Sequence, residues 1–361
     1  MGPFRIRFYC QLLMLSIWLS SACFGQSPSP TFRYALHAQK EPHPWTLVEI
    51  PAPPSTVLAT TPAGALLVLI PQPERKWVLK ELSGWYAQTP KEQSLTIGSG
   101  RVGRDEDVWI TGDLTVTRDG RYALVRITTR RRSTKTEVFD VEASTTVVDL
   151  NTFSAVTSRI TTDPLIAGAQ WSLTRDNVLV SNALTKRVRT NEQSTSTVTD
   201  SYQAAILDLP DLKASDACNY TKVLEFHNSS GWQTKEEETA NLKCAGVLKA
   251  AKVATVNDLP GENSAVKFAK ELHAPPSCNI TNVTDDGRFA LYDCSEGHQA
   301  WDMIITTSRS LLVLSTASGA SVLSVTLKPK QPTIATLVTA ESHQYLVVVR
   351  DGIMVEAYPL P

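Results

Sequence analysis

The sequence predicts an all-β fold, and three observations lead to that prediction. A strand–turn–strand pattern is clearest over residues 114–125, where alternating apolar residues run into Arg118-Asp119-Gly120 and continue as an apolar strand. The pattern returns at residues 280–291, around Asp285-Asp286-Gly287, and more weakly at residues 171–180. Turn residues then recur along the chain every 54 to 57 residues. Such a period indicates a repeated structural unit.

The repeat is defined by its turn residues, which are of types that tolerate a positive φ. They are Gly64, Gly120, Asn177, Gly231, Gly287 and Ser342. A second series of apolar strands ending in polar turns lies between them, at residues 78–84, 147–152, 206–211, 256–261 and 313–319. One period therefore holds about four short strands, which is typical of a β-propeller blade.

Six periods account for nearly all of residues 27–361, so we predict a single β-propeller domain of six four-stranded blades there. Seven blades are the alternative, if a further strand set lies within residues 27–58. The last period lacks a fourth strand, and either residues 32–37 or residues 45–50 could supply it and close the ring.

The fourth period departs from the pattern, because residues 235–243 and 265–272 have helix-favouring compositions. We predict a divergent blade with a partly helical insertion near residues 232–275. A lid over one face of the propeller is the alternative interpretation.

The first 26 residues have the features of a secretory signal peptide. Arg5 and Arg7 precede an apolar stretch at residues 12–19, which is too short to span a bilayer. A periplasmic or secreted protein without a transmembrane segment in its mature chain is therefore expected. Lipid attachment at Cys23 is less favoured, because Ser20 stands where that pattern has leucine.

The cysteines outside the signal segment predict two disulfides. If the turn at residues 285–287 is a three-residue loop, Cys278 and Cys294 lie eight residues on either side of Asp286 and face each other across the hairpin. This pairing leaves Cys218 and Cys244 as the second disulfide. Zinc is not favoured, because the sequence has no Cys-x-x-Cys pair.

Two connections within blades look long and basic, at residues 126–137 and 186–202. Because they belong to neighbouring blades, we expect one positive patch, made of Arg130, Arg131, Arg132, Lys135, Lys186, Arg187 and Arg189. Such a patch suits an acidic protein, a glycan or a phosphate-bearing surface. Solvated hairpin tips are the alternative. Nucleic acid is not expected, since the formal net charge is −1 and no aromatic residues interleave the patch.

No catalytic constellation is evident in the sequence, which has no His-x-His, His-Glu-x-x-His or Gly-x-Ser-x-Gly motif. Asp105 and Asp107, with Asp113 nearby, could bind calcium through their carboxylates. An acidic surface turn is the preferred interpretation, because the fuller ligand set of a calcium loop is missing. No other cofactor is predicted.

The repeats resemble those of TolB-type propellers and, more loosely, of the WD40/YVTN group. Asp119-Gly120-Arg121 and Asp286-Gly287-Arg288 match the turn of that repeat, and Trp171-Ser172 resembles its opening. The usual proline before the turn aspartate and the paired Gly-His and Trp-Asp signature are absent. The resemblance implies a propeller, often an interaction platform, and carries no catalytic residues.

The leading hypothesis is therefore an exported, monomeric, non-enzymatic scaffold that binds a protein or an acidic surface through its long-loop face. The alternative is a propeller enzyme, a lactonase- or quinoprotein-like hydrolase or oxidoreductase, with a site at the central channel.

Overall fold

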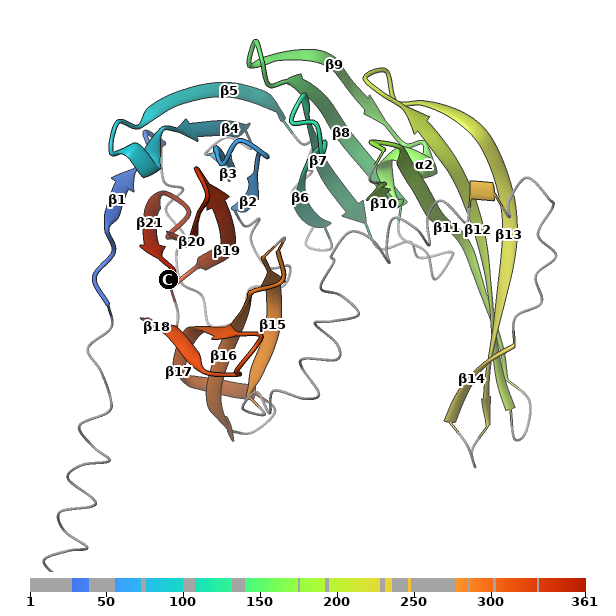
Figure 1. Cartoon of the computed structure of the whole chain (residues 1–361). Helices are drawn as coiled ribbons and strands as arrows, with labels where there is room; N and C mark the ends of the chain where they lie inside the picture. Colours follow the sequence, from blue (N-terminus) through green and yellow to red (C-terminus); the bar gives the residue numbers. More distant parts are fainter. Residues whose placement is uncertain are drawn as a thin grey trace, which may run out of the picture.

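The computed structural model describes residues 28–38, 56–72, 76–99, 108–131, 140–174, 176–191, 195–227, 231–235, 246–247, 277–284, 286–300, 303–329 and 331–361. Within these residues the chain forms five antiparallel sheets, as Figure 1 shows. No helix in the described part of the chain is long and apolar enough to cross a membrane.

Each sheet takes consecutive strands of the chain, except where the first strand joins the last sheet. The first sheet consists of β2 (Val57–Thr60), β3 (Leu66–Pro71), β4 (Lys76–Ser83) and β5 (Lys91–Ser99). The second consists of β6 (Val108–Val116), β7 (Tyr122–Arg131), β8 (Asp140–Asp149) and β9 (Ser154–Thr161). The third consists of β10 (Gln170–Leu173), β11 (Leu179–Asn191), β12 (Thr195–Asp208), β13 (Lys213–His227) and β14 (Gly231–Lys235).

The fourth sheet consists of β15 (Cys278–Val283), β16 (Phe289–Ala300), β17 (Met303–Ser315) and β18 (Ser321–Leu327). The fifth consists of β19 (Thr333–Ala340), β20 (His343–Arg350), β21 (Met354–Pro359) and β1 (Phe32–Ala35). Two short helices, η2 (Trp85–Ala87) and α2 (Pro164–Ala167), lie in connections.

Neighbouring sheets pack face to face through shared apolar clusters. The clusters join the first sheet to the second, the second to the third, the fourth to the fifth, and the fifth back to the first. Their members alternate along each strand, so that Leu67 and Leu69 face the second sheet while Leu66 and Val68 face the fifth. Meandering antiparallel sheets that pack in this way, four of them with four strands and the third with five, are the blades of a β-propeller, which confirms the predicted fold class.

The predicted turn residues confirm the repeat. Positive φ angles occur at Gly64, Gly120, Asn177, Gly287 and Ser342, which are five of the six predicted positions. A threonine also precedes each of these turns by three residues, at positions 61, 117, 174, 284 and 339, a regularity that our sequence analysis missed. In two of the turns the threonine Oγ1 donates to the turn aspartate, Thr117 to Asp119 and Thr284 to Asp286.

These turns also contact one another between sheets. The backbone N–H of Arg118 donates to Asn177 Oδ1 over 2.7 Å, which joins the second and third sheets. The amide of Gln344 donates to Asp286 Oδ2 over 2.7 Å, which joins the fifth and fourth. A local turn signal in the sequence is therefore also a contact between blades.

The N-terminal strand completes the last sheet, and residues 32–37 are one of the two segments predicted for this place. β1 pairs with β21, with Phe32 opposite Ala357 and Ala35 opposite Met354. The alternative segment, residues 45–50, lies outside the described residues.

The sixth turn, Gly231, was assigned wrongly. It begins β14, which pairs with β13 and extends the third sheet, so the hairpin before it does not start a separate blade. The helical insertion predicted near residues 232–275 falls almost wholly outside the described residues. The number of blades therefore stays a prediction.

The predicted disulfide between Cys278 and Cys294 is confirmed, and the two residues face each other on β15 and β16. Cys218 is also disulfide-bonded, and its predicted partner Cys244 lies outside the described residues.

Candidate functional site

The third sheet carries a long extension of three strands, whereas in the fourth sheet only two strands, β16 and β17, continue beyond their neighbours. β11, β12 and β13 contain 13, 14 and 15 residues, whereas β10 contains four and pairs only with residues 179–182 of β11. We call the part beyond β10 the arm: residues 183–191, 195–203 and 219–227, together with β14. Figure 1 shows this end of the third sheet projecting away from the other sheets.

The arm corrects the prediction of a long loop at residues 186–202. This stretch contains no glycine or proline and is rich in threonine and valine, so both sides of the hairpin continue as strands up to residues 192–194. The predicted loop at residues 126–137 is shorter for the same reason, because β7 continues to Arg131 and β8 begins at Asp140.

One face of the arm is organised around a buried carboxylate. Asp200, with its side chain 1% exposed, accepts two hydrogen bonds from Arg187, at 2.7 and 2.8 Å. Tyr202 donates its hydroxyl to the same carboxylate, and its ring stacks on Tyr220 at a centroid distance of 5.0 Å. Tyr220 in turn exchanges hydrogen bonds with Asn182. This network crosses three strands and stiffens the arm.

The electrostatics of this network follow from its geometry. The hydrogen bonds from Arg187 hold the pKa of Asp200 below its ordinary value, against the opposing effect of burial. Burial and the neighbouring Asp200 carboxylate raise the pKa of Tyr202 to about 12. Both groups therefore keep one protonation state near neutral pH, and the network has a structural role.

The predicted basic residues on the arm are exposed but point to both sides of it. Residues 185–190 are all exposed, and strand alternation places Lys186 and Val188 on one face, Arg187 and Arg189 on the other. Arg187 lies opposite Asp200 on β12 and is paired with it. Lys186 and Arg189 lie opposite Ser201 and Val198, so no acidic residue faces them across the ladder.

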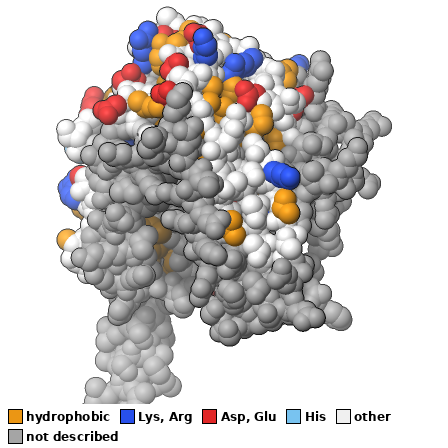
Figure 2. Space-filling view, turned by 90° about the vertical axis from the view of Figure 1, so that its right-hand side faces the viewer, with side chains coloured by type: hydrophobic (Ala, Val, Ile, Leu, Met, Phe, Trp, Pro, Cys, Tyr) orange, Lys and Arg blue, Asp and Glu red, His pale blue; other side chains and the backbone are white. Residues whose placement is uncertain are grey.

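The other members of the predicted patch belong to the second sheet. The Arg130 side chain is exposed near the end of β7, and those of Arg131, Arg132 and Lys135 lie outside the described residues. Figure 2 shows Lys and Arg side chains interspersed with acidic ones at one end of its face. One continuous patch therefore stays a prediction.

Arg126, expected at the start of a basic loop, is instead buried between the second and third sheets. Its guanidinium donates to the carbonyls of Ile166 and Ala169 and to Asp113, and lies 4.4 Å from the centroid of the Trp171 ring. Burial lowers the pKa of Arg126, and the Asp113 carboxylate opposes that effect. Asp113 is thus in an ion pair, while its predicted calcium-binding neighbours Asp105 and Asp107 lie outside the described residues.

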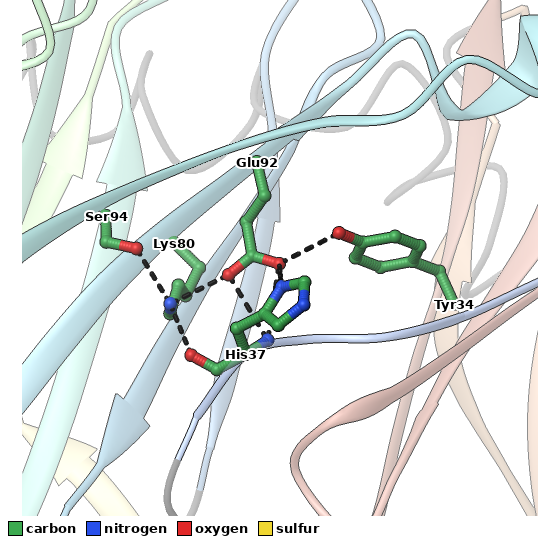
Figure 3. Close-up of polar contacts among 5 residues, drawn as sticks. All are labelled: Tyr34, His37, Lys80, Glu92 and Ser94. Atoms are coloured by element: carbon green, nitrogen blue, oxygen red, sulfur yellow. Dashed lines mark hydrogen bonds and ion pairs between the residues drawn. The ribbon is translucent and has the colours of Figure 1, made fainter.

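A second polar cluster, the N-terminal clasp, consists of Tyr34, His37, Lys80, Glu92 and Ser94 (Figure 3). Lys80 donates to His37 O at 2.6 Å, to Glu92 Oε1 at 2.7 Å and to Ser94 Oγ at 2.7 Å. Glu92 also accepts from Tyr34 and from the backbone N–H of His37. The cluster has no local signal in the sequence, because Tyr34 and His37 are distant along the chain from Lys80, Glu92 and Ser94.

The spacing of Ser94 and Lys80 is compatible with a nucleophile and its base, but the arrangement does not suit that chemistry. The amine uses three donors, which is all that an ammonium has, and one acceptor is a carboxylate. The Lys80 amine thus donates to Ser94 Oγ and serves as a fastening contact between the two segments. The clasp fastens the segment after β1 to the first sheet.

Among the described residues there is no group of three or more His, Cys, Asp or Glu side chains that could hold a metal ion.

No model of a known protein family and no curated protein matches the sequence. Among solved structures, the β-propeller domain of the Trilobed protease from Pyrococcus furiosus is 8% identical with a TM-score of 0.23, covering 92% of this chain and 84% of that chain. Prolyl oligopeptidase B from Galerina marginata is 7% identical with a TM-score of 0.30, covering 81% of this chain and 47% of that chain.

The WD40 domain of SCAP from fission yeast is 8% identical with a TM-score of 0.19, covering 84% of this chain and 59% of that chain. Similarities at this level carry no argument about function. The resemblance to TolB-type and WD40/YVTN propellers in particular stays a prediction.

Proposed function

We propose that the chain is an exported, non-enzymatic scaffold that binds an acidic partner through the arm. The observation that carries this proposal is the exposed run at residues 185–190, in which Lys186 and Arg189 are held on a stiff strand. An opposite charge on a partner is attracted to such a surface and steered to it.

The network around Asp200 supports this function indirectly. It fixes the arm as an ordered sheet, so the binding surface loses little conformational entropy when a partner docks. Export is supported by the Cys278–Cys294 disulfide, a bond typical of oxidising compartments.

Retention on a polyanionic resin such as heparin–agarose tests the proposal. The full chain is expected to elute at higher salt than the variant Lys186→Gln/Arg189→Gln, because ion pairing with the arm is screened by salt. A matched control is Lys91→Gln/Lys213→Gln, which removes two exposed cations elsewhere. Equal elution of the two double variants would contradict the arm as the docking surface.

A further inference from the structure

We propose that the open edge of β11 at residues 185–190 binds an extended acidic peptide by strand addition to the third sheet. This inference rests on the proposed function and names both the partner's chemistry and its mode of binding. The partner is a segment in which acidic residues are combined with a β-branched residue and which contains no proline.

The first argument is the geometry of the edge. β10 pairs with β11 only as far as Asn182, and from Ala183 onward the described part of the chain places no strand on that side. Residues 185–190 are exposed without exception. An edge strand presents backbone N–H and C=O groups that an incoming strand can pair with.

The second argument is that the edge is already ordered beyond the bulge at Thr185, where the register between β11 and β12 shifts. On its other side β11 pairs without interruption with β12 from Lys186 to Asn191, and β12 pairs in turn with β13. The Arg187–Asp200 ion pair joins the first two of these strands. An added strand would therefore meet an ordered template instead of a loop that has to be ordered on binding.

The third argument is charge, which selects the occupant. Lys186 lies on one face of the strand and Arg189 on the other, so a strand added at this edge meets a cation on both of its faces. The nearby Asp200 carboxylate is buried and bound to Arg187, so it does not neutralise the positive charge of Lys186 and Arg189 at the open edge. A second copy of β11 would bring its own cations against these, which disfavours self-pairing and supports a monomeric scaffold.

Val188 adds a contact of a different kind. Its side chain is 42% exposed and lies on the same face as Lys186. A β-branched residue opposite Val188 would cover it, while acidic residues pair with the flanking cations. An antiparallel partner runs in the direction opposite to β11. Its successive residues would be acidic opposite Arg189, β-branched opposite Val188, and acidic opposite Arg187 and Lys186.

The test uses two fluorescein-labelled peptides of equal charge at low ionic strength, with the full chain and anisotropy as the readout. One is acetyl-Thr-Thr-Glu-Val-Glu-Glu-Thr-Thr-amide. The other is acetyl-Pro-Thr-Glu-Pro-Glu-Glu-Pro-Thr-amide, which lacks several N–H donors and cannot extend a sheet. We expect the first peptide to bind the chain about tenfold more tightly than the second. The variant Lys186→Gln/Arg189→Gln should weaken binding of the first peptide by a similar factor. The control variant Lys91→Gln/Lys213→Gln should leave that affinity unchanged.

Hydrogen exchange gives a second readout, since strand addition should slow the amides of residues 185–190 only with the first peptide. Equal affinity for the two peptides, or no binding of either, would overturn strand addition. In both cases the salt-dependent retention on heparin–agarose would still report whether the arm docks polyanions, so the two proposals can fail separately.

Discussion

Replacing Lys80 with methionine is expected to destabilise the folded chain by about 3 to 5 kcal/mol, because it leaves the Glu92 carboxylate buried without its cation. The two side chains are only 7% and 8% exposed, and the N–O distance is 2.7 Å. An exposed pair of the same kind contributes roughly 0 to 1 kcal/mol, so the magnitude depends on this burial. Urea titration at pH 7 measures the loss.

The double variant Lys80→Met/Glu92→Gln separates the ion pair from the packing of the two side chains. Because it leaves no uncompensated buried charge, its loss should be smaller than the sum of the two single variants by about 2 to 3 kcal/mol. Limited proteolysis should also show cleavage near residues 28–38 in the Lys80→Met variant, since the clasp fastens this segment. A loss below about 1 kcal/mol in Lys80→Met would refute the reasoning.

Acid provides an independent check on the clasp. Burial by itself raises the pKa of Glu92, but the hydrogen bonds from Lys80 and His37 outweigh burial and hold that pKa below its ordinary value. Its contribution to stability is therefore present above the unfolded-state pKa of about 4.3 and is lost as the pH falls through the folded value. Glu92→Gln should remove this part of the pH dependence.

Three further predictions concern the sheets and their turns. Trp85→Phe should cost about 2 to 3 kcal/mol in urea titration, because the buried indole loses volume and its 2.8 Å hydrogen bond to Gly64 O. Cys278→Ala/Cys294→Ala should cost about 3 kcal/mol for a loop of 16 residues, and a reductant should lower the stability of the parent toward that of the variant. Gly120→Ala should lower the stability by about 1 to 2 kcal/mol, since φ is +70° and a Cβ would lie 3.1 Å from Pro62 Cδ. Gly287→Ala, at the same φ with no atom within 4 Å of the added Cβ, is its control and should lose only the conformational part.

The repeat was predictable because its signal is local. A turn with positive φ restricts the residue type at one position, and the spacing of those positions gives the period directly. Gly231 failed as a turn because a glycine at the expected spacing does not by itself say whether the next strand starts a sheet or extends one. The threonine three residues before each of the other five turns would have distinguished it, since Asn228 occupies that place.

The site was predicted only in part. The exposed basic residues on β11 were identified, but the assignment of residues 186–202 to a loop was wrong, because charge and polarity were taken as loop signals while β-branched residues carried the strand. Arg126 stood in the same basic run and is buried, since α2 and Trp171 of the next sheet cover it. Sequence cannot tell these arginines apart, because the difference lies in what packs against each strand.

The sequence by itself determined the period, five turn positions and the Cys278–Cys294 disulfide, because all of these follow from strand alternation and turn chemistry along one stretch of chain. It left two candidates for the strand that completes the last sheet, and the pairing of β1 with β21 decided between them. The tertiary structure alone decided which charges are buried, where β11 loses its neighbour, and how the segment after β1 meets Lys80 and Glu92. Those features depend on contacts between segments distant in sequence, and burial of a charge is a property of the surrounding protein and not of the residue.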